Sequence, residues 1–415
     1  MNKRGKILEL GYTMSTTQMA TTRLLESKFY GILLASIIIT GIFVSSAMSS
    51  LNSSISIPNS AIIAAISPLH VEGRYIKDVN NNTVVLRGVN KVEWADQPGG
   101  TWMGIPVNSI SSWNPTNVAT ELISMQSWGI NLIRCHQAIE QWLYNIEQHR
   151  QMLKEFIQLA AERGIYVVFD GYSVRNYANG ATQDPLPYPP YQTTPGANTI
   201  ITSGQDYINY MVSVASELKG YPNVIFELWN EPNGNDAAKA SWFSVAQRCI
   251  NAIRATGADN LIIFQWDYNC WANLDFPPPS GSAATMDWVW QANLTDSLGN
   301  LVYSTHIYRC YGAFQRSGGR AWTLADIQLA FQYFLFPNVT TKYPLIIGEI
   351  GCDLAYTGDE LTHELSAFDT CMTLFDQMGI SYTPFWWRDI GIFRLHGGAP
   401  HFTANAAGNI LVAHL

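Results

Sequence analysis

The sequence predicts an α/β fold, a (β/α)8 TIM barrel formed by residues 70–415. Three observations predict it: eight short apolar runs, helical stretches between them, and polar or aromatic residues where the runs end. Strands buried on both faces read as continuous apolar segments, as Val-Ile-Phe at 224–226 does. The predicted strands cover residues 84–89, 131–134, 166–170, 224–228, 261–265, 302–306, 345–348 and 382–386.

The stretches between the predicted strands carry apolar residues at i, i+3 and i+4, the spacing of one helix face. The second of these stretches ends at Gly164, a residue suited to a helix C-cap. The predicted helices cover residues 118–128, 152–163, 207–218, 242–255, 324–334 and 361–378.

A hairpin is predicted before the first barrel strand, where residues 71–76 are followed by a turn-rich segment at 78–82. We expect this hairpin to close the floor of the barrel. Two proline-containing stretches, 184–195 and 266–287, follow predicted strands three and five. They are expected to form long loops on the carboxyl-terminal face, where the active sites of barrel enzymes lie.

The N-terminal segment, residues 1–47, resembles an export signal. Basic residues including Lys3 and Arg4 precede an apolar run at 29–44, and the small residues 45–47 follow it. We expect either a cleaved signal peptide or a retained N-terminal membrane anchor, because the run approaches the length that spans a bilayer. Residues 48–69 are rich in Ser and Asn and are predicted to be a linker. The protein is therefore expected to be secreted or anchored at the outer cell surface.

Composition narrows the range of partners. The net charge of −8 over 415 residues provides no basic surface for a phosphate backbone, so nucleic acid is not an expected partner. Fourteen Trp and 20 Tyr suit a surface that contacts carbohydrate, and we expect a monomer that binds a polysaccharide or an oligosaccharide. The six Cys show no paired zinc-binding spacing. If the protein is exported, one disulfide among Cys270, Cys310 and Cys352 is expected near the barrel mouth.

Two glutamates stand where predicted strands end. Glu231 follows the fourth strand and precedes Pro232, which is expected to hold Glu231 in an extended conformation. Glu349 lies near two glycines after the seventh strand. Each has a structural alternative, the first turn of a helix for Glu231 and a buried ion pair with an arginine for Glu349. Two carboxyl groups facing each other across a barrel are, however, the equipment for glycoside hydrolysis.

Neighbouring residues give the two carboxyl groups different expected roles. Arg134 and Tyr308 could hydrogen-bond Glu349 and hold down its pKa. Glu231 follows a dry apolar strand and would stay protonated. His306 and His136 are of metal-ligating types, but no motif such as His-Glu-x-x-His is present, so no metal and no cofactor are predicted.

Aromatic residues at the strand ends are candidate sugar platforms. Trp386 and Trp387 are consecutive, so their side chains point to opposite faces and one of them is expected to face the barrel mouth. Trp266 and Trp271 lie in or near the loop after the fifth strand. At least one of these four indoles is expected to stack on a sugar ring.

Six motifs resemble glycoside hydrolase family 5, the cellulase and mannanase group of clan A, over about residues 70–390. They are the segment 86–90 ending in Asn90, Arg134 at a strand end, Asn230-Glu231-Pro232, His306-x-Tyr308, Gly348-Glu349 and the terminal Trp. The resemblance implies that Glu231 is the acid/base, Glu349 the nucleophile, and Asn230 the partner of the substrate 2-hydroxyl.

The same resemblance implies roles for the surrounding residues. Arg134 and Tyr308 would support Glu349, His306 would line the site near Glu231, and Trp386 would form the floor under the −1 sugar. The family usually carries a His two residues beyond the Asp of the third strand. Here Tyr172 stands at that position, so either Tyr172 replaces that His as a substrate contact or the chain is a divergent member.

The implied function is a retaining endo-β-1,4-glycanase that hydrolyses a β-glucan such as cellulose through a glycosyl-enzyme intermediate. A β-mannanase and an exo-β-glycosidase are alternatives on the same barrel. A carbohydrate-binding surface protein without activity is a further alternative, although such proteins typically lack one of the two carboxyl groups.

Overall fold

The computed structural model describes residues 66–91, 101–102, 105–106, 114–144, 146–172, 201, 203–232, 236–266, 285–308 and 323–415. The chain divides into units at 1–58 and 59–415, and all described residues belong to the second unit. The apolar run at 29–44 and most of the linker lie outside the described residues. Among the helices that are described, none has both the length and the apolar character needed to cross a membrane.

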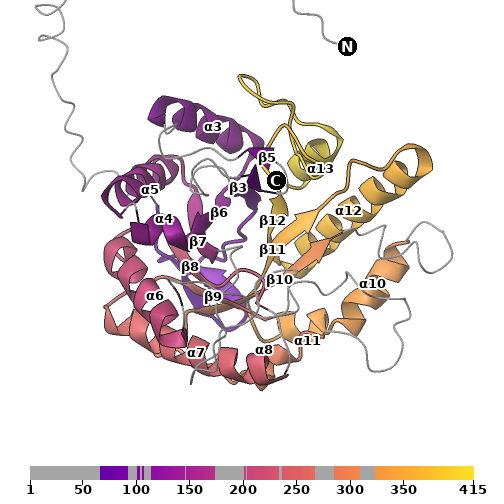
Figure 1. The fold of residues 1–415 in the computed structure, drawn as a ribbon. Coiled ribbons are helices and arrows are strands. Elements are labelled where there is room, and N and C mark those ends of the chain that lie inside the picture. The colour runs from indigo at the N-terminus through magenta and orange to yellow at the C-terminus, as the bar shows by residue number, and fades with distance from the viewer. Residues whose placement is uncertain are drawn as a thin grey trace, which may run out of the picture. The chain divides into compact units, whose positions relative to one another are not determined.

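Eight parallel strands form a barrel in the order of the sequence, which confirms the predicted fold class. Figure 1 shows helices arranged around these strands. The barrel strands are β3 (Gly88–Lys91), β6 (Leu132–Ala138), β7 (Tyr166–Tyr172), β8 (Val224–Leu228), β9 (Ile262–Gln265), β10 (Leu301–Tyr308), β11 (Leu345–Gly351) and β12 (Ser381–Phe385).

The barrel closes where the last strand meets the first. The backbone N–H of Tyr382 donates to the Leu86 carbonyl, and that of Trp387 donates to the Asn90 carbonyl, both at 2.9 Å. Arg87 and Tyr382 form a parallel bridge between these two bonds. Because hydrogen bonding continues around the sheet in this way, the polar strand ends face a common centre.

The register between neighbouring strands places polar residues beside one another at the carboxyl-terminal end of the barrel. Asn90 on β3 lies beside Arg134 on β6, and His306 on β10 lies beside Glu349 on β11. Asp170 on β7 is the register partner of His136 on one side and of Glu227 on β8 on the other. Pairing alone therefore brings polar residues of four neighbouring strand pairs to similar heights in the barrel.

Helices cover the outer face of the strands, and most begin earlier than predicted. The six expected helices are α3 (Pro115–Trp128), α5 (Ile146–Ala161), α6 (Gly204–Leu218), α7 (Asp236–Ala255), α10 (Leu324–Tyr333) and α12 (Gly358–Met378). Their first turns are polar and lack the apolar spacing on which the prediction relied, as Asp359 and Glu360 illustrate. Gly164 ends the turn after α5 in the left-handed region, at φ +70°, which confirms its predicted role.

Several short elements are absent from the sequence prediction. They are α4 (Ile139–Tyr144), α8 (Trp288–Gln291), α11 (Phe336–Thr340), α13 (Ala406–His414) and the antiparallel pair β4 (Thr101–Trp102) and β5 (Ile105–Pro106). All of them except α13 have six residues or fewer, which is too short for a helical or strand periodicity of apolar residues to be visible in the sequence.

The predicted hairpin is present as β1 (His70–Glu72) paired antiparallel with β2 (Tyr75–Lys77). Ile76 packs with side chains from the amino-terminal ends of the barrel strands, so the hairpin covers the barrel floor. Ile66 and Leu69 are buried in the same cluster. The packed unit thus includes the end of the segment that was predicted to be a linker.

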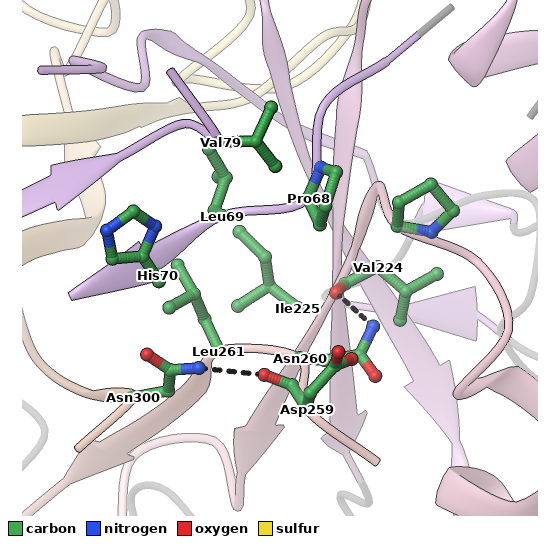
Figure 2. Close-up of a pocket in the computed structure, with 11 residues that line it drawn as sticks. Pro68, Leu69, His70, Val79, Val224, Ile225, Asp259, Asn260, Leu261 and Asn300 are labelled. Carbon is green, nitrogen blue, oxygen red and sulfur yellow. Dashed lines mark hydrogen bonds between the residues drawn. The ribbon is translucent and has the colours of Figure 1, made fainter. Parts of the chain in front are cut away.

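A cavity of about 200 Å³ lies at this floor, between the hairpin segment and the turns before β8, β9 and β10 (Figure 2). Its polar side chains are used structurally: Asn300 donates to the Asp259 carbonyl, and Asn260 donates to the Val224 carbonyl. The cavity is at the opposite end of the strands from the predicted catalytic glutamates.

Candidate active site

Arg134, on β6, is the centre of a buried polar network at the carboxyl-terminal end of the barrel. Its side chain is only 1% exposed, and every guanidinium nitrogen has a partner. The partners come from four other strands or strand ends: Glu227 at 2.6 Å, Asn230 at 2.7 Å, Glu349 at 2.8 Å, Asp170 at 3.0 Å and Asn90 at 3.1 Å. One fixed cation therefore positions residues that are far apart in the sequence.

Glu349 lies on β11 with both carboxyl oxygens occupied. Arg134 Nη1 donates to Oε1, and the Tyr308 hydroxyl donates to Oε2. Burial alone would raise the pKa of Glu349, but His306, His136 and Arg134 outweigh burial and hold this pKa well below its ordinary value. The hydrogen bonds expected from Arg134 and Tyr308 to Glu349 are present, and the direction of the pKa shift agrees with an ionised Glu349.

Glu231 follows β8 on a tight left-handed turn. Its φ is +49° and that of Trp229 is +57°, a region that side chains other than glycine seldom adopt. The expectation that Pro232 holds Glu231 extended is therefore wrong. A proline disfavours the right-handed helical region for its preceding residue, and the left-handed region is used here instead of the extended one. The Glu231 N–H donates to Gln265 Oε1 at 3.3 Å.

The Glu231 carboxyl group is surrounded by different charges from the Glu349 carboxyl group. Burial, together with the negative charge of Glu349, raises its pKa well above the ordinary value. Its Oε1 lies 2.7 Å from His306 Nδ1. The sequence predicts a protonated Glu231 and an ionised Glu349, and the opposite directions of the two pKa shifts agree with this prediction.

The two carboxyl groups lie close together. One oxygen of Glu231, one oxygen of Glu349 and one ring nitrogen of His306 all lie within 4.8 Å of one another. A metal ion could span such a spacing. Because Arg134 and Tyr308 already occupy the Glu349 oxygens, we do not assign these residues as metal ligands, and the absence of a metal stays a prediction.

His306, on β10, lies between Glu231 and Glu349 and is fully buried. Burial lowers its pKa to about 3, so the ring is neutral at pH 7. The glycine before Glu349 makes room for it, since a Cβ at Gly348 would lie 2.8 Å from His306 Nε2 and 2.6 Å from Ser304 Oγ. This close approach explains the glycine at that position.

The two asparagines of the predicted site are also in place. Asn90 donates through Nδ2 to the carbonyls of Gly348, at 2.9 Å, and Thr383, at 2.6 Å. Asn230 Oδ1 accepts from Arg134. Both amide groups are thereby fixed in orientation before any ligand is present.

The predicted tryptophans divide between the site and the core. Trp386 stacks on Phe385, and the ring of Phe385 meets the ring of Tyr308 edge-on. Trp386 therefore lies near Tyr308, the residue that donates to Glu349. Trp387 packs against Trp128 of α3 and belongs to the core between strands and helices. Of the two, only Trp386 is therefore beside the site, as the opposite orientation of consecutive side chains requires.

One further predicted sugar contact, Trp266, is not brought to the polar network. Trp266 is 6% exposed and packs edge-on against Phe243 of α7, so it is a core residue rather than an exposed platform. Tyr172 is the last residue of β7, and Trp271 lies outside the described residues, as does nearly all of the two long loops.

The site contains three acidic or basic residues that the sequence analysis did not assign to it: His136, Asp170 and Glu227. All three are buried, and each contacts Arg134. Burial raises the pKa of Glu227 to about 7 despite Arg134. A signal was available, because a charged residue inside an apolar strand, as in Val-Ile-Phe-Glu-Leu, needs a buried partner.

The expected disulfide does not include Cys352. This residue is free and buried, and burial raises the pKa of its thiol well above the ordinary value. Its side chain packs in the core between strands and helices. Cys270 and Cys310 lie outside the described residues, so a bridge between those two stays a prediction.

The family model described as "Cellulase (glycosyl hydrolase family 5)" matches residues 91–390, well over half of the chain. The chain belongs to glycosyl hydrolase family 5. The match covers nearly all barrel strands and both glutamates, which confirms the resemblance seen in the sequence.

Curated relatives of this family 5 chain include enzymes named for two polysaccharides. An endoglucanase from Clostridium saccharobutylicum is 24% identical over 197 residues, covering 47% of this chain and 36% of the relative. A mannan endo-1,4-beta-mannosidase from Cellvibrio japonicus is 20% identical over 256 residues, covering 60% and 48%. The match thus spans less than half the length of either relative.

Solved structures share the barrel at low identity. A beta-glucanase from Saccharophagus degradans is 16% identical with a TM-score of 0.61, covering 84% of this chain and 92% of its own. A beta-mannanase from Thermomonospora fusca is 18% identical with a TM-score of 0.55, covering 84% and 95%. These likenesses support the fold of the family 5 domain.

Proposed function

We propose that the protein is a retaining endo-β-1,4-glycanase that hydrolyses a β-glucan. The observation that carries the proposal is the pair Glu231 and Glu349, with oxygens within 4.8 Å and pKa values shifted in opposite directions. Retaining enzymes set their carboxyl groups about 5–5.5 Å apart, whereas inverting enzymes leave about 6.5–9.5 Å for a water molecule. The short separation favours retention.

In the first step, an ionised Glu349 oxygen attacks the anomeric carbon while the glycosidic C–O bond breaks. Glu231 donates its proton to the departing oxygen, so a covalent glycosyl ester and a protonated leaving group result. In the second step, the Glu231 carboxylate takes a proton from water, and the water oxygen displaces Glu349. Arg134 and Tyr308 hold the Glu349 oxygens in place throughout.

The substrate is proposed from the relatives together with the site. Several curated relatives are named endoglucanases, which favours a β-glucan. β-Mannan is the second candidate, since one relative is named a mannan endo-1,4-beta-mannosidase. Glucose and mannose differ only at the 2-hydroxyl, and Asn230 is the residue proposed to meet that group.

A substrate panel tests the proposal. The full chain is incubated with carboxymethyl-cellulose, lichenan, glucomannan and mannan, with Glu349→Ala as the inactive control. We expect rapid loss of viscosity on β-glucans, the sign of cuts within the chain. Release of single sugars without loss of viscosity would indicate exo action, and no hydrolysis of any substrate would favour a binding protein without activity.

Stereochemistry tests the retaining step separately. Proton NMR of the earliest product should show the β-anomer first, followed by slow mutarotation. If the α-anomer forms first, water attacks the sugar directly and Glu349 is not the nucleophile.

We further propose that the protein is exported and acts outside the cell as a monomer. This part of the proposal rests on the basic, apolar and small-residue order of residues 1–47 and on the polymeric substrate, which does not enter cells. Fractionation of expressing cells, followed by N-terminal sequencing of the product, distinguishes a cleaved signal from a retained anchor. Recovery of the chain in the soluble cell interior with its first residues intact would contradict export.

A further inference from the structure

The buried network has too few fixed positive charges for its carboxyl groups. Arg134 faces Asp170 at 3.0 Å, Glu227 at 2.6 Å and Glu349 at 2.8 Å. Even if Glu227 is protonated, two buried carboxylates share one guanidinium. Unpaired buried charge is costly, so a second cation is required nearby.

His136 is placed to supply that charge. It lies two residues after Arg134 on β6, so both side chains point to the barrel interior. Its Nδ1 is 2.8 Å from Asp170 Oδ2, and its Nε2 is 3.4 Å from Glu349 Oε1. The ring therefore connects a carboxylate on β7 with the proposed nucleophile on β11.

We propose that His136 is a positioning residue whose imidazolium, held by Asp170, keeps Glu349 ionised and fixed for attack on the anomeric carbon. The inference deepens the proposed function and rests on it for the role of Glu349. His136 itself acts through Glu349 and is given no contact with the sugar.

The alternative is a neutral ring, because Arg134 Nη1 lies 3.1 Å from His136 Nε2 and could donate to it. In that state the two carboxylates would lack their second cation. In the charged state, Nε2–H donates toward Asn90 Oδ1 at 3.2 Å and toward Glu349. Charge balance favours the charged state.

The titration of His136 depends on groups from every strand around it. Burial and the Arg134 guanidinium lower its pKa, but Asp170 and Glu349 outweigh them and raise it to about 9. The remaining neighbours include Glu227 on β8 and His306 on β10, whose pKa values both respond to the charge on His136, and the uncharged ring of Phe385 on β12. At pH 7 the imidazolium is therefore the main form.

The first test reads the charge in the resting protein without substrate. The eight histidines of the full chain are labelled with 15N, and the His136 signals are identified by their loss in His136→Gln. We expect both ring nitrogens to carry protons at pH 7, with a midpoint near pH 9 in the wild type and a lower midpoint in Asp170→Asn. A neutral ring at pH 7 would overturn the inference even if the enzyme is active.

The second test reads the effect on Glu349. An opposite charge at this range shifts a carboxyl pKa by about one to three units, so His136→Gln should move the acidic limb of kcat/KM up by about that amount. At a pH below the shifted limb of the variant, we expect kcat on aryl glycosides to fall about tenfold for each pKa unit with KM little changed, since the ionised fraction of Glu349 changes tenfold per unit there. His136→Lys, which restores a cation, should recover part of the shift.

A matched control separates positioning from general damage. His396 is a buried histidine that packs on Trp387, outside the network, so His396→Gln should leave the acidic limb in place. An unmoved acidic limb in folded His136→Gln would refute the inference. If His136→Gln does not fold, the titration of His136 in the wild type and in Asp170→Asn tests the inference instead. The His136 signals are then identified as those that shift in Asp170→Asn. Failure of the wild type on all glycosides would refute the proposed function but not the charge on His136.

Discussion

The two glutamates occupy environments that differ in charge more than in burial. Glu231 is 3% exposed and Glu349 is 5% exposed, yet their pKa values shift in opposite directions. The difference comes from position, because Arg134 contacts Glu349 whereas Glu231 contacts a neutral His306. Each carboxyl group is thus prepared for its proposed role before substrate binds.

The expected pH dependence of activity follows from the raised pKa of Glu231 and the lowered pKa of Glu349. Glu349 must be ionised, so activity should persist below the ordinary pKa of a glutamate and fall only as Glu349 gains a proton. Glu231 must be protonated, so activity should be lost at a pH well above that ordinary value. A bell-shaped profile of kcat/KM, measured on a soluble β-glucan, checks both limbs. An alkaline limb near pH 4 to 5 would mean that Glu231 is not the acid.

Replacement of Glu231 should affect substrates according to their leaving groups. Glu231→Ala is expected to lose about 10²- to 10⁴-fold on polysaccharide, whose leaving oxygen needs a proton. The first step on an aryl glycoside should survive, so that a glycosyl-enzyme accumulates on Glu349 and azide accelerates its turnover. Glu349→Ala should fail on both substrates. Equal losses without azide rescue for Glu231→Ala would contradict the assignment.

At the scale of elements, the contact between β3 and β6 leaves no room for a side chain. A Cβ at Gly88 would lie 1.7 Å from the Leu132 carbonyl oxygen, which is a backbone atom in the paired strand. Gly88→Ala should therefore reduce the free energy of unfolding by more than about 3 kcal/mol. Urea denaturation measures this change.

Gly220 provides the matched control for this substitution. It lies in the turn between α6 and β8, and its Cβ would meet no atom within 4 Å. Gly220→Ala should change the free energy of unfolding by less than about 0.5 kcal/mol. If both variants are equally stable, the tight approach of β3 to β6 has no energetic importance.

The ion pair between α7 and the turn before β10 should show its own pH dependence. Arg254 donates two hydrogen bonds of 2.8 Å to Asp296. Burial raises the pKa of Asp296, but Arg254 outweighs burial and lowers it below the ordinary value. The contribution to stability is therefore present above pH 4 and lost as pH falls through the lowered pKa.

Asp296→Asn should accordingly cost about 2 kcal/mol of unfolding free energy at pH 7. The difference from the wild type should shrink as the solution is acidified. The exposed residue Asp259 is the control, and Asp259→Asn should have little effect at any pH. A constant difference between wild type and Asp296→Asn down to acid pH would argue against the ion pair.

The sequence predicts the eight barrel strands, the six long helices and part of the polar network. The eight strands were recognisable because their apolar runs are continuous, and Arg134, Asn230 and Glu349 because each follows such a run within a family motif. His136 could have been found from the two-residue period that places it beside Arg134. Asp170 and Glu227 depend on the register between neighbouring strands, which no local pattern specifies.

At the scale of the whole molecule, the barrel separates stability from chemistry along its axis. The floor contains an apolar cluster and the hairpin, whereas the opposite end contains the charged network around Arg134. Ile76, which is 4% exposed, packs in the floor cluster. Its truncation should therefore weaken the fold without disturbing the glutamates.

Ile76→Ala is expected to cost about 2–5 kcal/mol of unfolding free energy and to leave kcat unchanged at temperatures where the variant is folded. The neighbouring Val79 is 63% exposed, so Val79→Ala serves as the control for both measurements. A loss of kcat in folded Ile76→Ala would show that the floor and the site are coupled.

The closure of the barrel also determines when the site can exist. Asn90 finds the carbonyl partners of its side chain 258 and 293 residues later in the chain, at Gly348 and Thr383. During synthesis, the first strand must therefore wait for the last strand to leave the ribosome. A chain that is still growing contains Arg134 and Glu231 but not the assembled polar network, so the site exists only when translation of the barrel is complete.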